Sequence, residues 1–180
     1  MNMMDDIDRV LITKEQIDEK VAEMGKKISE DFKDKNLLLV GVLKGSVMFM
    51  TDLMKNISIP AAIDFMSVSS YGKGTKSSGV VKIEKDLDVP LENYDVLIVE
   101  DILDSGITLS YIMEVLKNKN AKSIKLATLL NKPDRRKVEV KLDYEGFIIP
   151  DEFVVGYGLD YAEKYRNLPF IGVLKPEIYN

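Results

Sequence analysis

The stretch VLIVEDILDSGITL, residues 96–109, decides how this chain folds. Four consecutive apolar residues at 96–99 are typical of a buried strand, and two adjacent carboxylates, Glu100 and Asp101, follow them directly. After the loop at 104–108, apolar residues at helical spacing predict a helix from about 108 to 117, with Leu109, Ile112, Met113 and Leu116 on one face. Unpaired N–H groups at a helix start suit a phosphate, and carboxylates suit a divalent cation or sugar hydroxyls. The stretch therefore favours a phosphorylated sugar as ligand.

The rest of the chain predicts strands and helices around this unit. Apolar runs and alternating patterns predict strands at 37–42, 63–68, 80–84 and 124–130, and shorter strands at 144–148, 154–156 and 170–174. Thr13 and Gln16 resemble a capping box that opens a helix with Ile17, Val21, Met24 and Ile28 inward. A second helix follows the turn at 43–46, with Val47, Met50, Leu53 and Met54 inward. Strands that alternate with helices predict a single α/β domain over 1–180 with a parallel sheet.

Polar side chains are expected to gather at one edge of this sheet. Ligands of parallel sheets sit beyond the carboxyl ends of the strands. Five side chains are predicted to lie just past strand ends and to converge: Lys44, Glu100, Asp101, Asp104 and Lys132. Between two predicted strands, SSYGKGTKSSG at 69–79 reads as an exposed, mobile excursion.

Composition excludes several kinds of chemistry. The 180 residues contain neither cysteine nor histidine, which excludes thiolate nucleophiles, serine–histidine–acid triads and imidazole metal sites. Any metal must be a hard, oxygen-liganded ion such as Mg²⁺. The net charge of −5 disfavours nucleic-acid binding through bulk positive charge. Without a membrane-length apolar run or an export signal, we expect a cytoplasmic protein.

Several motifs together resemble one known family. VEDILDSGITL, at 99–109, resembles the phosphoribosyl-pyrophosphate-binding motif of the type I phosphoribosyltransferases. LKGS at 43–46, the Ser70-Tyr71 pair, LLNKP at 129–133 and the segment 151–174 resemble the pyrophosphate turn, the flexible loop, the purine-reading segment and the purine hood of the hypoxanthine-guanine branch. The resemblance runs from about Val10 to the C-terminus. It implies a central parallel sheet flanked by helices, a flexible active-site loop, and a small purine-binding hood formed by N-terminal residues and about 144–180.

The resemblance also implies roles for individual residues. Asp104 would be the catalytic general base and acid at N7 of the purine, which a carboxylate can do near neutral pH when burial raises its pKa. The 5′-phosphate would be held by Ser105, Gly106, Ile107 and Thr108, with Ile107 contributing only backbone. Lys44, Gly45 and Arg166 would bind pyrophosphate, with the Leu43–Lys44 peptide bond cis.

A second set of residues would bind the base and the metal. Lys132 would donate to O6 of the base and so select 6-oxopurines over adenine. Phe153 would stack on the base, Val154 would offer main-chain groups, and Asp160 would join the purine site and bind a second Mg²⁺. Glu100 and Asp101 would engage the ribose hydroxyls and Mg²⁺. Ser70 and Tyr71 would belong to a lid that excludes water.

The implied reaction transfers phosphoribose from 5-phospho-α-D-ribose 1-diphosphate to hypoxanthine or guanine and releases pyrophosphate. Xanthine as the base stays open. A regulatory relative that binds RNA or DNA is the second alternative, and only one basic cluster favours it, which is more typical of a solvated loop: Lys132, Arg135, Arg136, Lys137 and Lys141. The family implies a homo-dimer or homo-tetramer, although no motif here encodes the oligomeric state.

Overall fold

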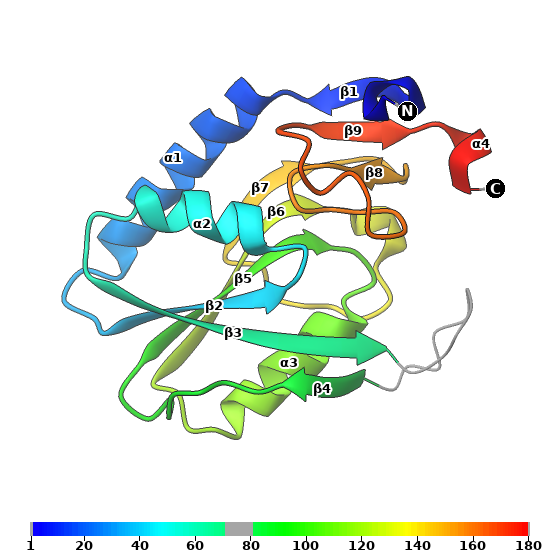
Figure 1. Ribbon diagram of the computed structural model, residues 1–180. Coiled ribbons are helices and arrows are strands. Elements are labelled where there is room, and N and C mark those ends of the chain that lie inside the picture. Colours follow the sequence, from blue (N-terminus) through cyan, green and yellow to red (C-terminus); the bar gives the residue numbers. More distant parts are fainter. Residues whose placement is uncertain (1, 71–80, 180) are drawn as a thin grey trace.

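A central six-stranded sheet carries the fold (Figure 1). The computed structural model describes residues 2–70 and 81–179. In the order β4-β3-β2-β5-β6-β7, the strands of this sheet are β4 (Val81–Lys85), β3 (Ala61–Ser70), β2 (Leu37–Leu43), β5 (Asp95–Leu103), β6 (Ser123–Asn131) and β7 (Tyr144–Ile148). Neighbours are parallel except β3 and β4, which are antiparallel. The returning strand expected at 80–84 is thus confirmed. Ser69 and Ser70, expected in the mobile excursion, instead end β3 and pair with β4, whereas Tyr71 and residues 72–79 of the predicted lid lie outside the described residues.

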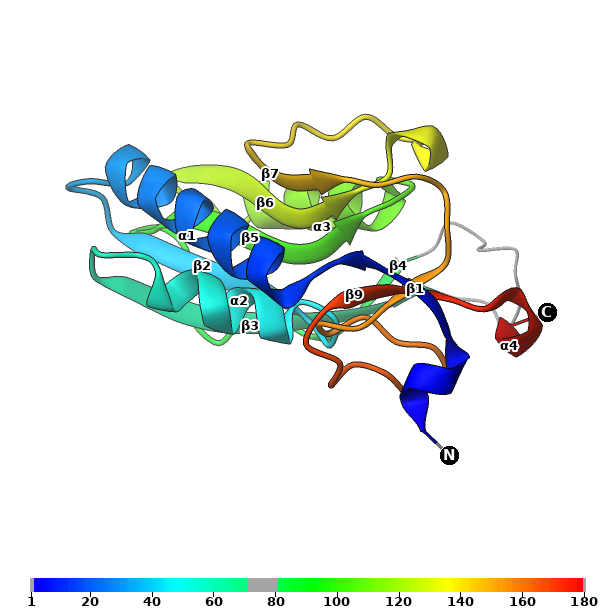
Figure 2. The ribbon, with the colours of Figure 1, turned by 90° about the horizontal axis from the view of Figure 1, so that it is seen from above.

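Helices cover both faces of the sheet, which explains the apolar runs in its central strands. The helices α1 (Lys14–Asp31) and α2 (Val47–Lys55) lie on one face, and α3 (Ile107–Lys117) lies on the other (Figures 1 and 2). Successive side chains of a strand point to opposite faces. Leu37 and Leu39 therefore pack with α1 and α2, while Leu38 and Val40 pack with α3. A strand buried on both faces has no polar positions to alternate with apolar ones.

The first helix begins where the capping box predicts. Gln16 N donates to Thr13 Oγ1 (3.2 Å), and Thr13 N donates to Gln16 Oε1 (2.8 Å). The predicted inner residues of α1 are buried: Ile17, Val21, Met24 and Ile28.

The inner face predicted for α2 is partly wrong. Phe49, Met50 and Leu53 are buried there, whereas Val47 and Met54 are exposed by 37% and 40%. At about 100° per residue, Val47 and Met54 each lie about 90° or more from the centre of the buried stripe. The buried stripe is therefore narrower than the apolar pattern of the segment.

The strand β5 is longer than its apolar run. Pairing with β2 stops at Gly41 and Val99, but pairing with β6 continues through Glu100 and Thr128 to Leu103 and Asn131. Glu100 and Asp101 consequently lie inside the strand, which corrects the expectation that they follow its end. This end of β5 pairs with β6 but no longer with β2.

A small second sheet forms a hood at one end of the molecule. It has the order β1-β9-β8, from β1 (Ile7–Ile12), β9 (Ile171–Leu174) and β8 (Val154–Val155), and both pairings are antiparallel. Sequence patterns predicted β8 and β9 but not β1, whose burial does not alternate. Both termini lie at the hood end, with the short helix α4 (Pro176–Tyr179) after β9 (Figure 2). Among the residues described, no helix is both long and apolar enough to cross a membrane.

Candidate active site

Three neighbouring strands deliver charged side chains to one edge of the main sheet. Lys44 follows β2, Asp104 follows β5 and Lys132 follows β6, and these strands are adjacent and parallel. Parallel strands end at the same edge, where ligands of such sheets bind. The strand ends that were predicted to converge therefore lie side by side.

The loop between β5 and α3 borders a cavity of about 210 Å³. Ser105, Gly106 and Thr108 line it together with Glu100 and Asp101. Gly106 has φ 81°, and a Cβ built there would lie 2.2 Å from the carbonyl oxygen of Val138, so this position requires glycine. The first N–H groups of α3 have no helical partner and lie at this end of the helix. Hydroxyls and helix N–H groups therefore surround a space that suits an anion.

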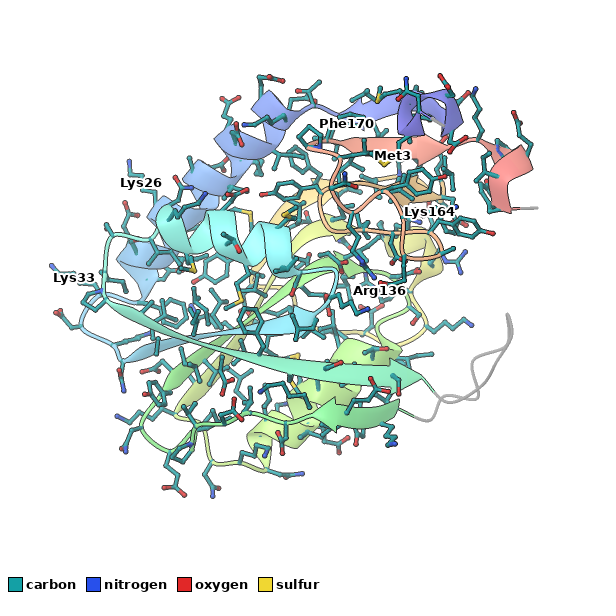
Figure 3. The ribbon with its side chains drawn as sticks, viewed as in Figure 1. Met3, Lys26, Lys33, Arg136, Lys164 and Phe170 are labelled. Atoms are coloured by element: carbon teal, nitrogen blue, oxygen red, sulfur yellow. The ribbon has the colours of Figure 1, made fainter. Side chains whose placement is uncertain are left out.

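Two arginines hold the loop and its aspartate. Arg135 Nε donates to Asp104 Oδ1 (3.0 Å), and Arg136 Nε donates to the carbonyl oxygen of Asp104 (3.0 Å). Arg136 also donates to Asn131 Oδ1, and it is labelled above α3 in the view of Figure 3. The basic cluster was expected to be a solvated loop. The expectation is correct for Arg135, whose side chain is 52% exposed, and wrong for Arg136, which is half-buried, and for Lys132, which is buried.

Glu100 and Asp101 form a buried carboxylate pair. Each is 9% exposed. Burial, and then repulsion by Asp101, raises the pKa of Glu100 well above its usual value, and burial also raises the pKa of Asp101. The hydrogen bonds recorded for them come from backbone, from Asp101 N to Glu100 Oε1 (3.1 Å) and from Ile102 N to Asp101 Oδ1 (2.7 Å). Two backbone hydrogen bonds compensate little of the cost of burying two negative charges, so the pair fits a hard cation such as Mg²⁺.

Two carboxylates do not make a complete metal cage. Within the described ranges, no group of three or more acidic side chains is close enough to hold a metal ion by itself. Mg²⁺ usually keeps water or substrate phosphate among its ligands, so a two-carboxylate site is compatible with it.

The turn after β2 is packed between Asp101 and the hood. The Leu43–Lys44 peptide bond is cis, as the resemblance implied. A Cβ built on Gly45 would lie 1.7 Å from Asp101 Oδ2. On the other side, a Cβ built on Gly158 would lie 2.1 Å from the carbonyl oxygen of Gly45, and Gly158 has φ 100°. Glycine at both positions allows the backbone of the turn to contact both neighbours.

Arg166 ties the hood segment to this turn. Arg166 Nη1 donates to the carbonyl oxygen of Gly158 (2.7 Å), and Arg166 Nη2 lies 3.0 Å from Asp160 Oδ1. The same Nη2 lies 3.0 Å from Glu163 Oε1, while Lys44 Nζ lies 3.0 Å from Glu163 Oε2. Lys44 and Arg166, which were both predicted to bind pyrophosphate, thus contact the same carboxylate. Through its contact with Arg166, Asp160 belongs to the same cluster of charged side chains.

A second cavity, of about 330 Å³, opens beside Asp104. Its described lining is Asp104, Lys132, Arg135, Asp151, Glu152, Phe153 and Tyr179. Lys132 is 8% exposed, its Nζ donates to the carbonyl oxygen of Glu152 (2.6 Å), and burial lowers its pKa. An ammonium group has three N–H donors, so Lys132 can donate to a ligand while it keeps this bond.

The aromatic side of this cavity comes from the hood. Phe153 is 37% exposed and stacks on Tyr179 with ring centroids 4.7 Å apart, while Tyr161 meets it edge-on at 5.6 Å. Phe153 is therefore no ordinary core aromatic. Next to it, Val154 begins the edge strand β8, whose backbone groups facing away from β9 have no strand partner in the described sheet.

A more voluminous cavity than these two lies elsewhere. It measures about 540 Å³ and is bordered by α1, α2 and the loop at 167–169. Its charged side chains pair with each other, Lys14 with Asp18 and Lys55 with Asp52 (2.7 Å). Because these charged side chains are already paired, few of them are free to bind a charged ligand. We therefore place the active site at the edge of the main sheet.

The side chains of this region that sequence reasoning missed include Arg135, Arg136, Glu163 and Tyr179. The arginines were visible as a basic pair just after a strand end. Glu163 and Tyr179 had no pattern of their own, because the folding of the hood brings them to the site.

Comparisons with known proteins agree with this geometry. Residues 12–162 match the family described as phosphoribosyl transferase domain. The chain is 56% identical to the hypoxanthine-guanine phosphoribosyltransferase of Bacillus subtilis, with 98% of each chain covered. A solved structure of a hypoxanthine phosphoribosyltransferase from Staphylococcus aureus is 53% identical in sequence and superposes with a TM-score of 0.95. The superposition covers 99% of this chain and 97% of that one.

Another relative is larger. The bifunctional protein TilS/HprT of Listeria monocytogenes is 56% identical over 99% of this chain, but the chain spans 28% of that protein. The matched region is thus a whole protein in some relatives and one part of a longer chain in others. The extent and identity of these matches show that the chain belongs to the phosphoribosyltransferase family, among the hypoxanthine-guanine phosphoribosyltransferases.

Proposed function

We propose that this protein serves purine salvage by transferring the 5-phosphoribosyl group of 5-phospho-α-D-ribose 1-diphosphate to hypoxanthine or guanine. The products are IMP or GMP and pyrophosphate. One observation carries the proposal: Asp104 lines both the anion cavity at α3 and the base cavity under the hood. A reaction that joins a sugar phosphate to a base needs one group at the junction of the two sites.

On the base side, Asp104 accepts and returns the proton at N7, and Lys132 donates to O6. The buried position of Lys132 supports this role, because a donor that is withdrawn from water discriminates strongly against a base that cannot accept. Phe153 stacks on the ring, and Val154 offers backbone groups to its edge.

On the sugar side, Ser105, Gly106, Ile107 and Thr108 hold the 5′-phosphate at the start of α3, and Glu100 and Asp101 engage the ribose hydroxyls. Lys44, Gly45 and Arg166 bind pyrophosphate and stabilise its negative charge as it leaves. When bound, Mg²⁺ adds positive charge at the pyrophosphate, and Glu100, Asp101 and Asp160 are the residues that would hold it. Asp160 already pairs with Arg166, which makes it the less open ligand.

The proposal also treats residues 1–180 as one domain with a hood over the base, and Ser70 and Tyr71 as part of a lid that keeps water from the ribose cation. Further parts of the proposal are a homo-dimer or homo-tetramer and a cytoplasmic location. Sedimentation of the purified protein and fractionation of cells test these two parts.

The central test is a panel of bases with the purified protein, phosphoribosyl pyrophosphate and Mg²⁺: hypoxanthine, guanine, xanthine, adenine and uracil. Asp104→Asn removes the proton acceptor, and Asp134→Asn, an exposed neighbouring carboxylate, is the matched control. We expect turnover of hypoxanthine and guanine that chelation abolishes. Activity should fall by about 10²-fold or more in Asp104→Asn, because general acid–base catalysis contributes about 10²–10⁴, and stay near wild type in Asp134→Asn.

Two results would contradict the proposal. The absence of turnover with every base favours a binding or regulatory protein on this fold, and salt-sensitive RNA or DNA binding is then the next measurement. Equal rates in Asp104→Asn and wild type remove Asp104 from the mechanism. Turnover of xanthine at a comparable rate widens the substrate range without changing the reaction.

A further inference from the structure

We propose, on the basis of the proposed function, that Glu163 is an internal competitor of pyrophosphate that weakens product binding. Each of its two carboxylate oxygens contacts one of the two cationic side chains, Lys44 and Arg166, that are proposed to bind pyrophosphate. Lys44 Nζ lies 3.0 Å from Oε2, and Arg166 Nη2 lies 3.0 Å from Oε1. The carboxylate therefore stands where an oxyanion bound by both cations would stand.

The backbone holds Glu163 in this place. Ala162, Glu163 and Tyr165 have φ values of 51°, 61° and 76°, in the left-handed region that residues with a side chain rarely adopt. Glu163 N donates to Asp160 Oδ2 (2.9 Å), and Tyr165 is buried with its hydroxyl donating to Asp6 Oδ2 (2.8 Å). Such conformations persist where surrounding contacts impose them, and they concentrate at functional sites.

The two cations depend on Glu163 to different degrees. Arg166 is also held by Asp160 and by the carbonyl oxygen of Gly158. For Lys44, the contact with Glu163 is the one side-chain partner recorded in the described parts of the chain. Pyrophosphate must therefore displace Glu163 chiefly from Lys44, while Arg166 stays in position.

The contact contributes little to folding. The side chains of Lys44 and Glu163 are 67% and 64% exposed, and ion pairs this open to water stabilise a fold weakly. The neighbouring cations lower the pKa of Glu163, so the carboxylate is charged at neutral pH. A fixed negative charge beside an anion site opposes the anion, and it opposes one with several charges most. The expected benefit is faster release of pyrophosphate after each turnover.

The test is Glu163→Gln, which keeps the shape of the side chain and removes its charge. Glu92→Gln is the matched control, because Glu92 is exposed and lies just before β5, at the opposite edge of the sheet. Pyrophosphate binding is measured by calorimetry with Mg²⁺ present, and product inhibition is measured in the forward reaction. We expect Glu163→Gln to bind pyrophosphate about three- to tenfold more tightly, from the Coulomb energy of unit charges about 4 Å apart in water. Raising the salt concentration should narrow this difference, and the KM for hypoxanthine should not change.

Unchanged or weaker pyrophosphate binding in Glu163→Gln overturns the proposal, and weaker binding shows that Glu163 organises Lys44 instead. These results differ from a failure of the proposed function. In that case the wild-type protein itself neither binds pyrophosphate nor converts hypoxanthine, and both proposals are lost.

Discussion

Gly45→Ala is the sharpest test of how the turn after β2 is packed. The added Cβ would lie 1.7 Å from Asp101 Oδ2, whereas ordinary contact begins at 3.4 Å, so the two atoms must separate by another 1.7 Å. Asp101 cannot swing away freely, because it is buried and its Oδ1 accepts from Ile102 N at 2.7 Å. The turn cannot retreat either, because the backbone of Gly158 packs against its other side. Substitution must therefore displace the turn or the carboxylate.

Displacement should affect catalysis more than folding. A misplacement of about 1 Å at a reacting site can reduce the rate by about 10²-fold. We expect kcat/KM for phosphoribosyl pyrophosphate to fall by about that factor, with a higher KM for this substrate and little change in the KM for hypoxanthine. Overpacking costs about 1–3 kcal/mol, which for a chain of this size lowers Tm by roughly 2–12 °C.

The assay combines initial rates of IMP formation, at varied concentrations of each substrate, with thermal unfolding. Gly25→Ala is the control, because its Cβ would meet the Asn56 backbone at 2.6 Å, at the contact between α1 and the end of α2. It should lower Tm by a similar amount without raising the KM for phosphoribosyl pyrophosphate. If Gly45→Ala keeps kcat/KM within about threefold of wild type, the turn is not confined as the contacts indicate, and the reasoning is refuted.

Three further substitutions test other contacts. Lys132→Gln replaces a charged donor and should lower kcat/KM for hypoxanthine by about 10- to 100-fold, because hydrogen bonds to charged groups contribute about 1.5–3 kcal/mol; an unchanged value removes Lys132 from base recognition. Tyr157→Phe removes the buried hydroxyl that donates to Asp52 Oδ2 at 2.6 Å and should destabilise the fold by about 1–3 kcal/mol, so an unchanged denaturation midpoint contradicts this estimate. Tyr179→Ala removes the ring stacked on Phe153 and should raise the KM for hypoxanthine about two- to tenfold, whereas Tyr179→Phe should behave like wild type; a lower KM in Tyr179→Ala would mean that Tyr179 obstructs the base.

The centre of the main sheet could be predicted because β2, β5 and β6 are buried on both faces. The runs at 37–42, 96–99 and 124–130 correspond to β2, β5 and β6 to within a few residues. The end of β5 could not be predicted from hydropathy, because its last residues are held by pairing with β6 and two of them are carboxylates. The strand β1 could not be predicted either, since its pairing partner β9 lies about 160 residues further along the chain and its own sequence does not alternate.

The candidate site was predictable where a residue follows a strand end, and not where the hood supplies it. Lys44, Asp104 and Lys132 follow β2, β5 and β6, so strand assignment alone brings them together. Glu163 reaches Lys44 through a segment of left-handed backbone, and Tyr179 reaches Phe153 from the last helix. Neither conformation has a signature in the sequence, because glycine and asparagine, the usual signs of left-handed backbone, are absent from 162–165.

The contact between Gly45 and Gly158 links the two halves of the site. The turn with Gly45 belongs to the main sheet, and the segment with Gly158 leads from β8, where the base is proposed to bind, to Arg166. A shift of the hood away from the sheet would therefore move Phe153 and Arg166 together. The base and the pyrophosphate would then be bound or released by the same motion, while Asp104, held from the sheet side by Arg136, stays in place between them.

If the hood moves in this way, a substitution at Gly158 should weaken the binding of both substrates, because its Cβ would lie 2.1 Å from the carbonyl oxygen of Gly45. Gly158→Ala should therefore raise both KM values, in contrast to Gly45→Ala, and an increase for one substrate alone would show that the hood does not move as a unit.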